Sequence, residues 1–103
     1  MAARRRRVVW TEQAGRMLEE AATYIAQDSH DAAERLLLRT LEAAASLDVS
    51  SERGRTVPEW DRPTVREIFV QRYRLLYEVT PEEVHILAFL HSARDLRRWR
   101  LED

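Results

Sequence analysis

Four arginines and one histidine in the second half of the chain have the side chains best suited to chemistry. They are Arg66, Arg72, Arg74, His91 and Arg94. Arginine stays charged at any physiological pH and offers a planar fork of N–H donors that fits phosphate or carboxylate. An imidazole ordinarily exchanges a proton near neutral pH, so a histidine among arginines also suggests acid–base chemistry. If these side chains converge on one surface, they would bind a phosphodiester or the acidic tail of a protein partner.

Local ion pairs are the alternative for each arginine. The local partners are Glu67 for Arg66, Glu78 or Glu83 for Arg74, and Asp95 for Arg94. For any one arginine the local pair is favoured. For the group, binding is favoured, because Arg72 and Arg74 have no local excess of acid. His91 has a similar alternative as a hydrogen-bonding group that only supports the structure.

The sequence contains none of the usual signatures of a metal or cofactor site. It has no cysteine, and its three histidines belong to different predicted elements, without a second ligand at helical spacing. It has no glycine-rich phosphate loop and no serine in a nucleophile elbow. All 17 basic residues are arginine, so no lysine is available for catalysis. We therefore expect no metal and no cofactor, and the conventional hydrolase, kinase and dinucleotide-binding classes are excluded.

The length of 103 residues suits one domain with its own core. We place this domain at 1–103, with frayed ends at 1–5 and 100–103. No apolar run approaches the roughly 20 residues that span a bilayer, and Arg4–Arg7 leads into only a short apolar stretch. A chain without cysteine suits a reducing compartment. The expected location is cytoplasmic, without a membrane partner.

Three blocks in the second half predict strands of an antiparallel sheet. They cover residues 66–71, 73–79 and 83–91; apolar and polar residues alternate in the first two, and the third is more uniformly apolar. In the middle block this alternation places Tyr73 and Tyr77 on one face and Arg74 on the other. A turn containing Pro81 joins the last two blocks.

The first half predicts a strand followed by a helical hairpin. Residues 6–10 have strand character, and Thr11 is the expected N-cap of the first helix. The second helix covers about 32–47, with Asp31 as its expected cap, and a long loop at 50–63 packs along the sheet. The apolar stripes of the two helices include Met17, Leu18, Ile25, Leu37 and Leu41. The predicted fold is α+β, in the order β-α-α-β-β-β, with an antiparallel helical hairpin packed on a small antiparallel sheet.

Four motifs in order resemble the RelE/ParE superfamily of bacterial type II toxins. They are GRTVPE at 54–59, VREI at 65–68, YRLLY at 73–77 and LHSARD at 90–95. The resemblance extends over about residues 8–99 and favours the ParE branch over the RelE branch.

This resemblance implies a toxin held silent by a cognate antitoxin in a heterotetramer or larger complex, with growth arrest and plasmid stabilisation as its biology. The antitoxin's tail would fold over the helical hairpin, in a groove that includes Met17, Leu18, Ile25, Leu37 and Leu41. ParE-like relatives inhibit DNA gyrase by binding, without chemistry of their own. The residues expected to bind the target or the antitoxin are Arg66, Arg72, Arg74, Tyr77, His91, Arg94 and Trp99. Direct nucleic-acid binding is not expected without a partner.

The RelE branch implies a different activity, ribosome-dependent cleavage of messenger RNA. Its candidate catalytic residues in this chain are Arg66, Arg74, His91 and Arg94. The chain lacks the lysines that such nucleases carry on their sheet, and Trp99 stands where they end in tyrosine. These departures favour gyrase inhibition. A third possibility is an inactive family member that serves only as antitoxin partner or co-repressor.

Overall fold

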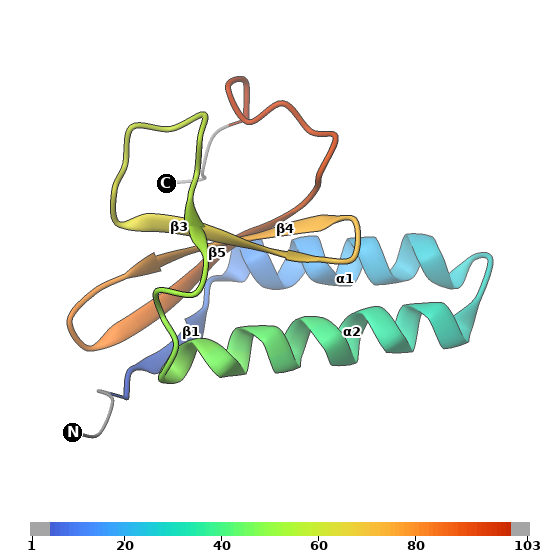
Figure 1. The fold of residues 1–103 in the computed structure, drawn as a ribbon. Coiled ribbons are helices and arrows are strands. Elements are labelled where there is room, and N and C mark those ends of the chain that lie inside the picture. The colour runs from blue at the N-terminus through green and yellow to red at the C-terminus, as the bar shows by residue number, and fades with distance from the viewer. Residues whose placement is uncertain (1–4, 100–103) are drawn as a thin grey trace.

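A five-stranded sheet runs through the middle of the protein, with two helices against one of its faces (Figure 1). The computed structural model describes residues 5–99, so the predicted frayed ends lie outside the described residues except for Arg5. The elements are β1 Arg7–Trp10, α1 Glu12–Ala26, α2 His30–Ala45, the 3₁₀ turn η1 Ser46–Asp48, β2 Arg55–Thr56, β3 Val65–Val70, β4 Tyr73–Val79 and β5 Glu83–His91. The α+β prediction is confirmed. Neither helix in this part of the chain is long and apolar enough to cross a membrane.

The sheet is mixed, whereas the sequence predicted a purely antiparallel sheet. Its order is β1-β5-β4-β3-β2, and β1 pairs in parallel with β5 while all other pairs are antiparallel. Between β1 and β5 the chain passes through the helical hairpin and three other strands. This long excursion is the kind of connection that parallel pairing requires.

Strand β5 contains a β-bulge that changes which face its side chains occupy. Tyr77 pairs with Ile86 whereas Leu76 pairs with Ala88, so Leu87 is the extra residue. The backbone carbonyl of Ile86 accepts two hydrogen bonds from Thr11, from its hydroxyl at 2.8 Å and its amide at 3.1 Å. Thr11 therefore fixes the bulge and also begins α1.

The N-cap of α1 is the residue that the sequence predicts, whereas the N-cap of α2 is a different residue. As predicted, the Thr11 hydroxyl accepts a hydrogen bond from the Ala14 amide at 3.1 Å. The second helix begins earlier than predicted, because the hydroxyl of Ser29, and not Asp31, accepts from the Ala32 amide at 3.1 Å. Asp31 lies in the first turn, where a carboxylate still interacts favourably with the helix dipole.

Each face of the sheet has its own apolar core. The helices cover one face with residues such as Leu18 and Leu36, which pack against Leu75 and Tyr77 of β4. The other face is covered by the long loop and by the segment after β5. Its core contains Val57, Val65, Leu76, Ala88, Leu90 and Leu96, with Trp60 and Trp99 packed against it.

The two tryptophans hold the covering segments of the second face together. The Trp60 indole N–H donates to the carbonyl of Leu96 at 3.0 Å, and the rings of Trp60 and Trp99 stack with centroids 6.2 Å apart. The loop therefore packs along the sheet, as its sequence predicts, and it does so through Val57 and Trp60.

Candidate functional site

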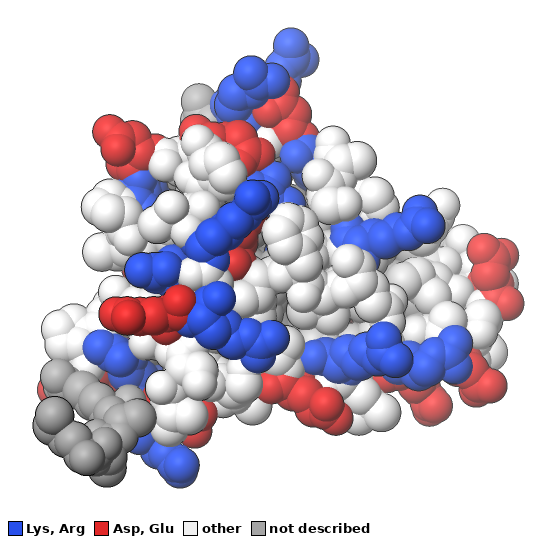
Figure 2. Space-filling view, viewed as in Figure 1, with Lys and Arg blue, Asp and Glu red and all other residues white. Residues whose placement is uncertain are grey.

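The candidate arginines do not converge on one surface. Figure 2 shows positively charged side chains spread over the helical layer, over the sheet and near the C-terminal segment, with acidic side chains among them. We therefore follow each candidate residue to its actual surroundings.

Arg74 is buried in an ion-pair network on the face of the sheet away from the helices, with 5% of its surface exposed. Its Nε donates to a Glu67 carboxylate oxygen at 2.5 Å, and its two terminal nitrogens donate to Glu59 at 2.8 and 2.9 Å. Glu67, whose side chain is fully buried, also accepts from Arg55 Nε at 2.7 Å. Arg74 was predicted to offer its charge to a partner, but two acids of its own chain occupy the guanidinium in this structure.

The sequence suggested Glu78 or Glu83 as the local partner of Arg74, and neither of them is one of these two acids. Glu67 faces it from the neighbouring strand, and Glu59 reaches it from the long loop. The hydrogen bonds that Arg74 donates to Glu59 raise the pKa of the Arg74 guanidinium, and the same bonds lower the pKa of the Glu59 carboxyl. The network therefore keeps all its charges and ties the loop to the sheet.

Arg66 and Tyr77 brace the start of β2 from the helix-covered face of the sheet. Arg66 Nη1 donates to the Gly54 carbonyl at 2.7 Å. The fully buried Tyr77 hydroxyl donates to the Ser51 carbonyl at 2.8 Å and accepts from the Gly54 amide at 2.9 Å. Burial raises the pKa of this tyrosine. Tyr77 was predicted to bind a partner, but no part of it reaches the surface in this structure.

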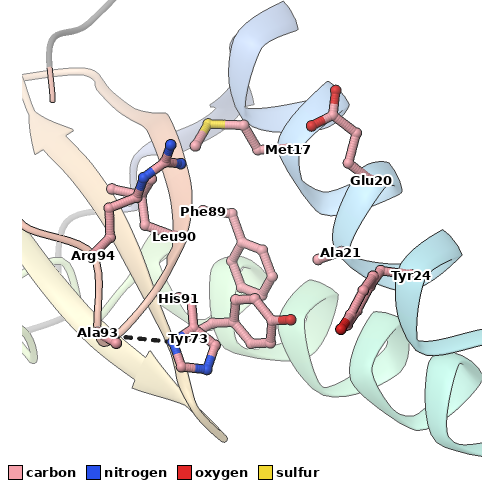
Figure 3. Close-up of a pocket in the computed structure, with 10 residues that line it drawn as sticks. All are labelled: Met17, Glu20, Ala21, Tyr24, Tyr73, Phe89, Leu90, His91, Ala93 and Arg94. Atoms are coloured by element: carbon pink, nitrogen blue, oxygen red, sulfur yellow. Dashed lines mark hydrogen bonds between the residues drawn. The ribbon is translucent and has the colours of Figure 1, made fainter.

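His91 and Arg94 both line an open pocket of about 510 Å³ between α1 and the end of β5, where the guanidinium of Arg94 points away from the His91 ring (Figure 3). Its lining residues are Met17, Glu20, Ala21, Tyr24, Tyr73, Phe89, Leu90, His91, Ala93 and Arg94. Tyr73 stacks on Phe89 with ring centroids 4.7 Å apart and meets the His91 ring edge-on at 5.5 Å. This is an aromatic floor with charged groups at its rim.

The polar groups of the pocket are available to a ligand. The amide of Ala93 donates to His91 Nδ1 at 3.1 Å, which requires an unprotonated Nδ1 and leaves the exposed Nε2 to donate outward. Arg94 is exposed and makes no ion pair within residues 5–99, since its neighbour Asp95 pairs with Arg97. On the helix side, Glu20 and the 72% exposed Tyr24 complete the rim.

This arrangement suits recognition of a protein segment. An aromatic floor can bury one large apolar side chain, and a neighbouring carboxylate of the same segment would meet Arg94 at the rim. Tyr24, Tyr73 and Arg94 are also of the residue types that dominate binding energy at protein interfaces. Glu20, Tyr24 and Phe89 were not among the sequence-based candidates. Tyr24 could have been found as an aromatic residue on the polar side of a predicted helix.

The remaining candidates are dispersed. Arg72 lies exposed in the β3–β4 turn, where its carbonyl accepts from the Ser92 amide at 2.7 Å. Trp99 is half-buried against Trp60 and contributes to the second core.

The five predicted groove residues do not form one groove. Met17 lines the pocket, but Leu18 is only 6% exposed and belongs to the core beneath it. Ile25 and Leu37 are half-buried against that core, whereas Leu41 is 49% exposed on α2. Leu18 is therefore excluded from a docking surface, because the sheet already covers it.

Comparison with known proteins matches the chain to one family over most of its length. The family model of the ParE toxin of the type II toxin–antitoxin system parDE matches residues 8–96. The chain is 41% identical over 88 residues to the toxin RelE2 of Caulobacter vibrioides, a match that covers 84% of this chain and 96% of that protein. It shares its fold with a structure titled chromosomal ParDE TA system from P. aeruginosa, with a TM-score of 0.70 and 18% identity over 86% of this chain and 98% of the other.

Proposed function

The chain belongs to the ParE toxin family of type II toxin–antitoxin systems, and on that premise we propose that it inhibits DNA gyrase by binding and is neutralised by its cognate antitoxin. The family implies an antitoxin partner. The proposal concerns the target and the mode of action: inhibition comes from occupying a surface of gyrase, and the toxin itself breaks no covalent bond.

The internal neutralisation of Arg74 is the observation that supports binding over catalysis. A nuclease must hold cationic groups free at the scissile phosphate, where they stabilise the charge that develops in the transition state. Arg74 is instead held by Glu59 and Glu67, and Glu67 also pairs with Arg55. A phosphate approaching this face would meet equal numbers of negative and positive groups, the two carboxylates and the two guanidinium groups of this network. The position therefore offers no net positive charge for catalysis.

The pocket between α1 and β5 supports an antitoxin site. It combines an apolar floor with an arginine that makes no ion pair in the described part of the chain. A tail segment that folds on binding can place an apolar side chain in such a pocket and an acidic one beside it. Occupation of the pocket by the antitoxin would hide Arg94 and His91 from any other partner.

A supercoiling assay tests the proposal directly. Purified toxin is incubated with gyrase, ATP and relaxed plasmid, and we expect loss of supercoiling or accumulation of cleaved plasmid, reversed by the antitoxin encoded beside this gene. A matched variant is Arg94→Gln, which removes the charge of the pocket arginine without touching either core. A folded toxin that leaves gyrase fully active at a large excess would refute the gyrase proposal.

Ribosome-dependent cleavage is the second candidate, favoured by His91, whose Nδ1 accepts from the Ala93 amide and leaves Nε2 to donate, in the same pocket as Arg94. A translation assay on the same preparation separates the two activities, because a nuclease cuts translated messages at defined positions. His91→Gln would abolish such cuts but leave gyrase inhibition in place. Normal growth on expression without antitoxin would instead indicate an inactive family member.

A further inference from the structure

Four arginines lie together where helix α2 meets the segment that leads into β2. They are Arg35, Arg39, Arg53 and Arg66, and we call them the arginine band. Arg39 and Arg53 line a shallow cavity of about 340 Å³ between α2 and the segment before β2, and Arg35 lies one helical turn from Arg39 on the same face of α2. Figure 2 shows positive side chains along the helical layer and over the adjoining part of the sheet, with acidic ones among them.

Arg66 joins the band through the segment that leads into β2. Its Nη1 donates to the carbonyl of Gly54, the residue that follows Arg53, at 2.7 Å. Both arginines also act on one buried phenol: burial raises the pKa of Tyr77, and the charges of Arg66 and Arg53 oppose that rise. The two guanidinium groups therefore lie near the same hydroxyl, on the helix-covered side of the sheet.

The arginine band keeps its positive charge. Arg53 Nη1 donates to the Ser46 hydroxyl at 2.6 Å, and the acceptor for Arg66 is a backbone carbonyl, so neutral oxygens orient both groups without cancelling their charge. Unlike the buried Arg74, no arginine of the band makes an ion pair within residues 5–99. Glu42 lines the same cavity but pairs with none of them in this part of the chain. Each guanidinium therefore retains N–H donors for an anion.

A stiff polyanion fits this surface better than a flexible acidic peptide does. The cavity has one apolar lining residue, Ala43, so it offers no anchor for a large side chain. A disordered segment that folds on binding must offset its ordering cost, largely by burying apolar groups, whereas a DNA duplex is already ordered and can bind through its phosphates alone. The planar fork of arginine also matches phosphate oxygens well. The chemistry of the band therefore favours the backbone of double-stranded DNA as its partner.

We propose that the arginine band lies against the phosphate backbone of the DNA that gyrase holds, so that the toxin binds the gyrase–DNA complex more tightly than gyrase alone. This inference rests on the proposed function, and it adds DNA to the partners of the toxin. The band is formed by α2 and the segments around β2, apart from the pocket between α1 and β5. Because contacts to phosphate release counterions, the added affinity should fall steeply with salt.

The first experiment measures the band on free DNA. The full-length toxin is titrated into a short fluorescent DNA duplex at several salt concentrations, and the test variant is Arg35→Gln/Arg39→Gln/Arg53→Gln. Arg66 is left in place because it braces β2. We expect the test variant to reduce the slope of log K against log salt by about 2–3 and to bind the duplex about tenfold more weakly at low salt.

A matched control separates the band from net charge. Arg7→Gln/Arg62→Gln/Arg98→Gln removes the same number of charges from exposed positions outside the band. It should change the salt slope by less than about 1, because these positions make no phosphate contact in the proposed arrangement. Circular dichroism verifies that both triple variants fold.

The second experiment places the band on gyrase. The affinity of the toxin is measured for gyrase alone and for gyrase loaded with DNA. We expect the wild type and the control variant to bind the loaded enzyme about tenfold more tightly, because phosphate contacts are then added to the protein contacts. The test variant should bind both forms equally, with the affinity that the wild type has for gyrase alone.

Three outcomes would contradict the reasoning in different ways. Equal salt slopes for the wild type and the test variant would overturn the DNA contact. A test variant that loses affinity only for the antitoxin would also overturn it, since the band would then bind an acidic segment of that protein. Failure of the wild-type toxin to bind gyrase in either state would instead refute the proposed function, whereas the duplex titration would still support or overturn the contact of the band with DNA.

Discussion

Replacing Arg74 by methionine should strongly destabilise the protein, because it leaves a buried carboxylate without its main partner. Glu67 would keep only its bond to Arg55, which is half-exposed, and the side chain of Glu67 is fully buried. Removal of one partner from a buried ion pair costs about 3–5 kcal/mol. Because the bond to Arg55 remains, we expect the free energy of unfolding to fall by about 3 kcal/mol. For a domain of this size that loss lowers Tm by roughly 10–20 °C.

Urea unfolding followed by circular dichroism measures this loss. The control is Arg72→Met, the same chemical change at an exposed position two residues away, which should alter the free energy of unfolding by no more than about 0.5 kcal/mol. The double variant Arg74→Met/Glu67→Leu removes both buried charges and should recover part of the stability. If Arg74→Met and Arg72→Met cost the same, the buried network does not stabilise the fold and the argument against a free catalytic arginine fails.

Three further predictions concern other parts of the fold. Thr11→Val removes both the helix cap and the hydroxyl bond to the bulge, and should lower the free energy of unfolding by about 1–2 kcal/mol in urea titrations. Gly54→Ala places a methyl group 2.5 Å from the Glu67 carbonyl and the Tyr77 hydroxyl, so it should lower Tm clearly, and an unchanged Tm would contradict the close packing. Acid should weaken the protein: the hydrogen bonds from Arg74 hold the folded-state pKa of Glu59 below its ordinary value, so the stability that this carboxylate adds at neutral pH is lost as the pH falls through the lowered pKa. Glu59→Gln should flatten that decline in urea midpoints measured from pH 6 to pH 3.

The alternation of residues 73–79 was enough to predict the two faces of the central strand. Tyr73, Leu75 and Tyr77 pack toward the helices, and Leu76 packs toward the other core. Local capping chemistry similarly located the start of α1 at Thr11. These features depend on neighbouring residues in the chain, so the sequence contains the relevant signal.

The pairing of Arg74 with Glu59 could not be predicted in this way. Glu59 lies in a loop without periodicity, and its distance from Arg74 is decided by how Val57 and Trp60 pack on the sheet. The bulge at Leu87 was equally hidden, because it lies in a run of apolar residues where a change of face leaves no mark on the pattern. The parallel pairing of β1 also depends on a tertiary arrangement.

The candidate site was predicted only in part, because some of its residues come together only through the tertiary arrangement. His91 and Arg94 were chosen for their residue types, and both line the pocket because His91 ends β5 and Arg94 lies three residues beyond it. The helix side of the pocket, Glu20 and Tyr24, was missed, because no local pattern relates α1 to the last strand. The surroundings of Arg74 could not be predicted, because its residue type suggested binding and no local sequence pattern indicated its burial.

The position of β5 in the sheet has a consequence for the order of assembly. This strand pairs with both β1 and β4, so the first strand of the chain finds its partner only after the last strand has been synthesised. The second core closes later still, when Leu96 arrives. A chain that still lacks these residues has neither the pocket between α1 and β5 nor a closed second core, so the surface offered to a partner exists only once the sheet is complete.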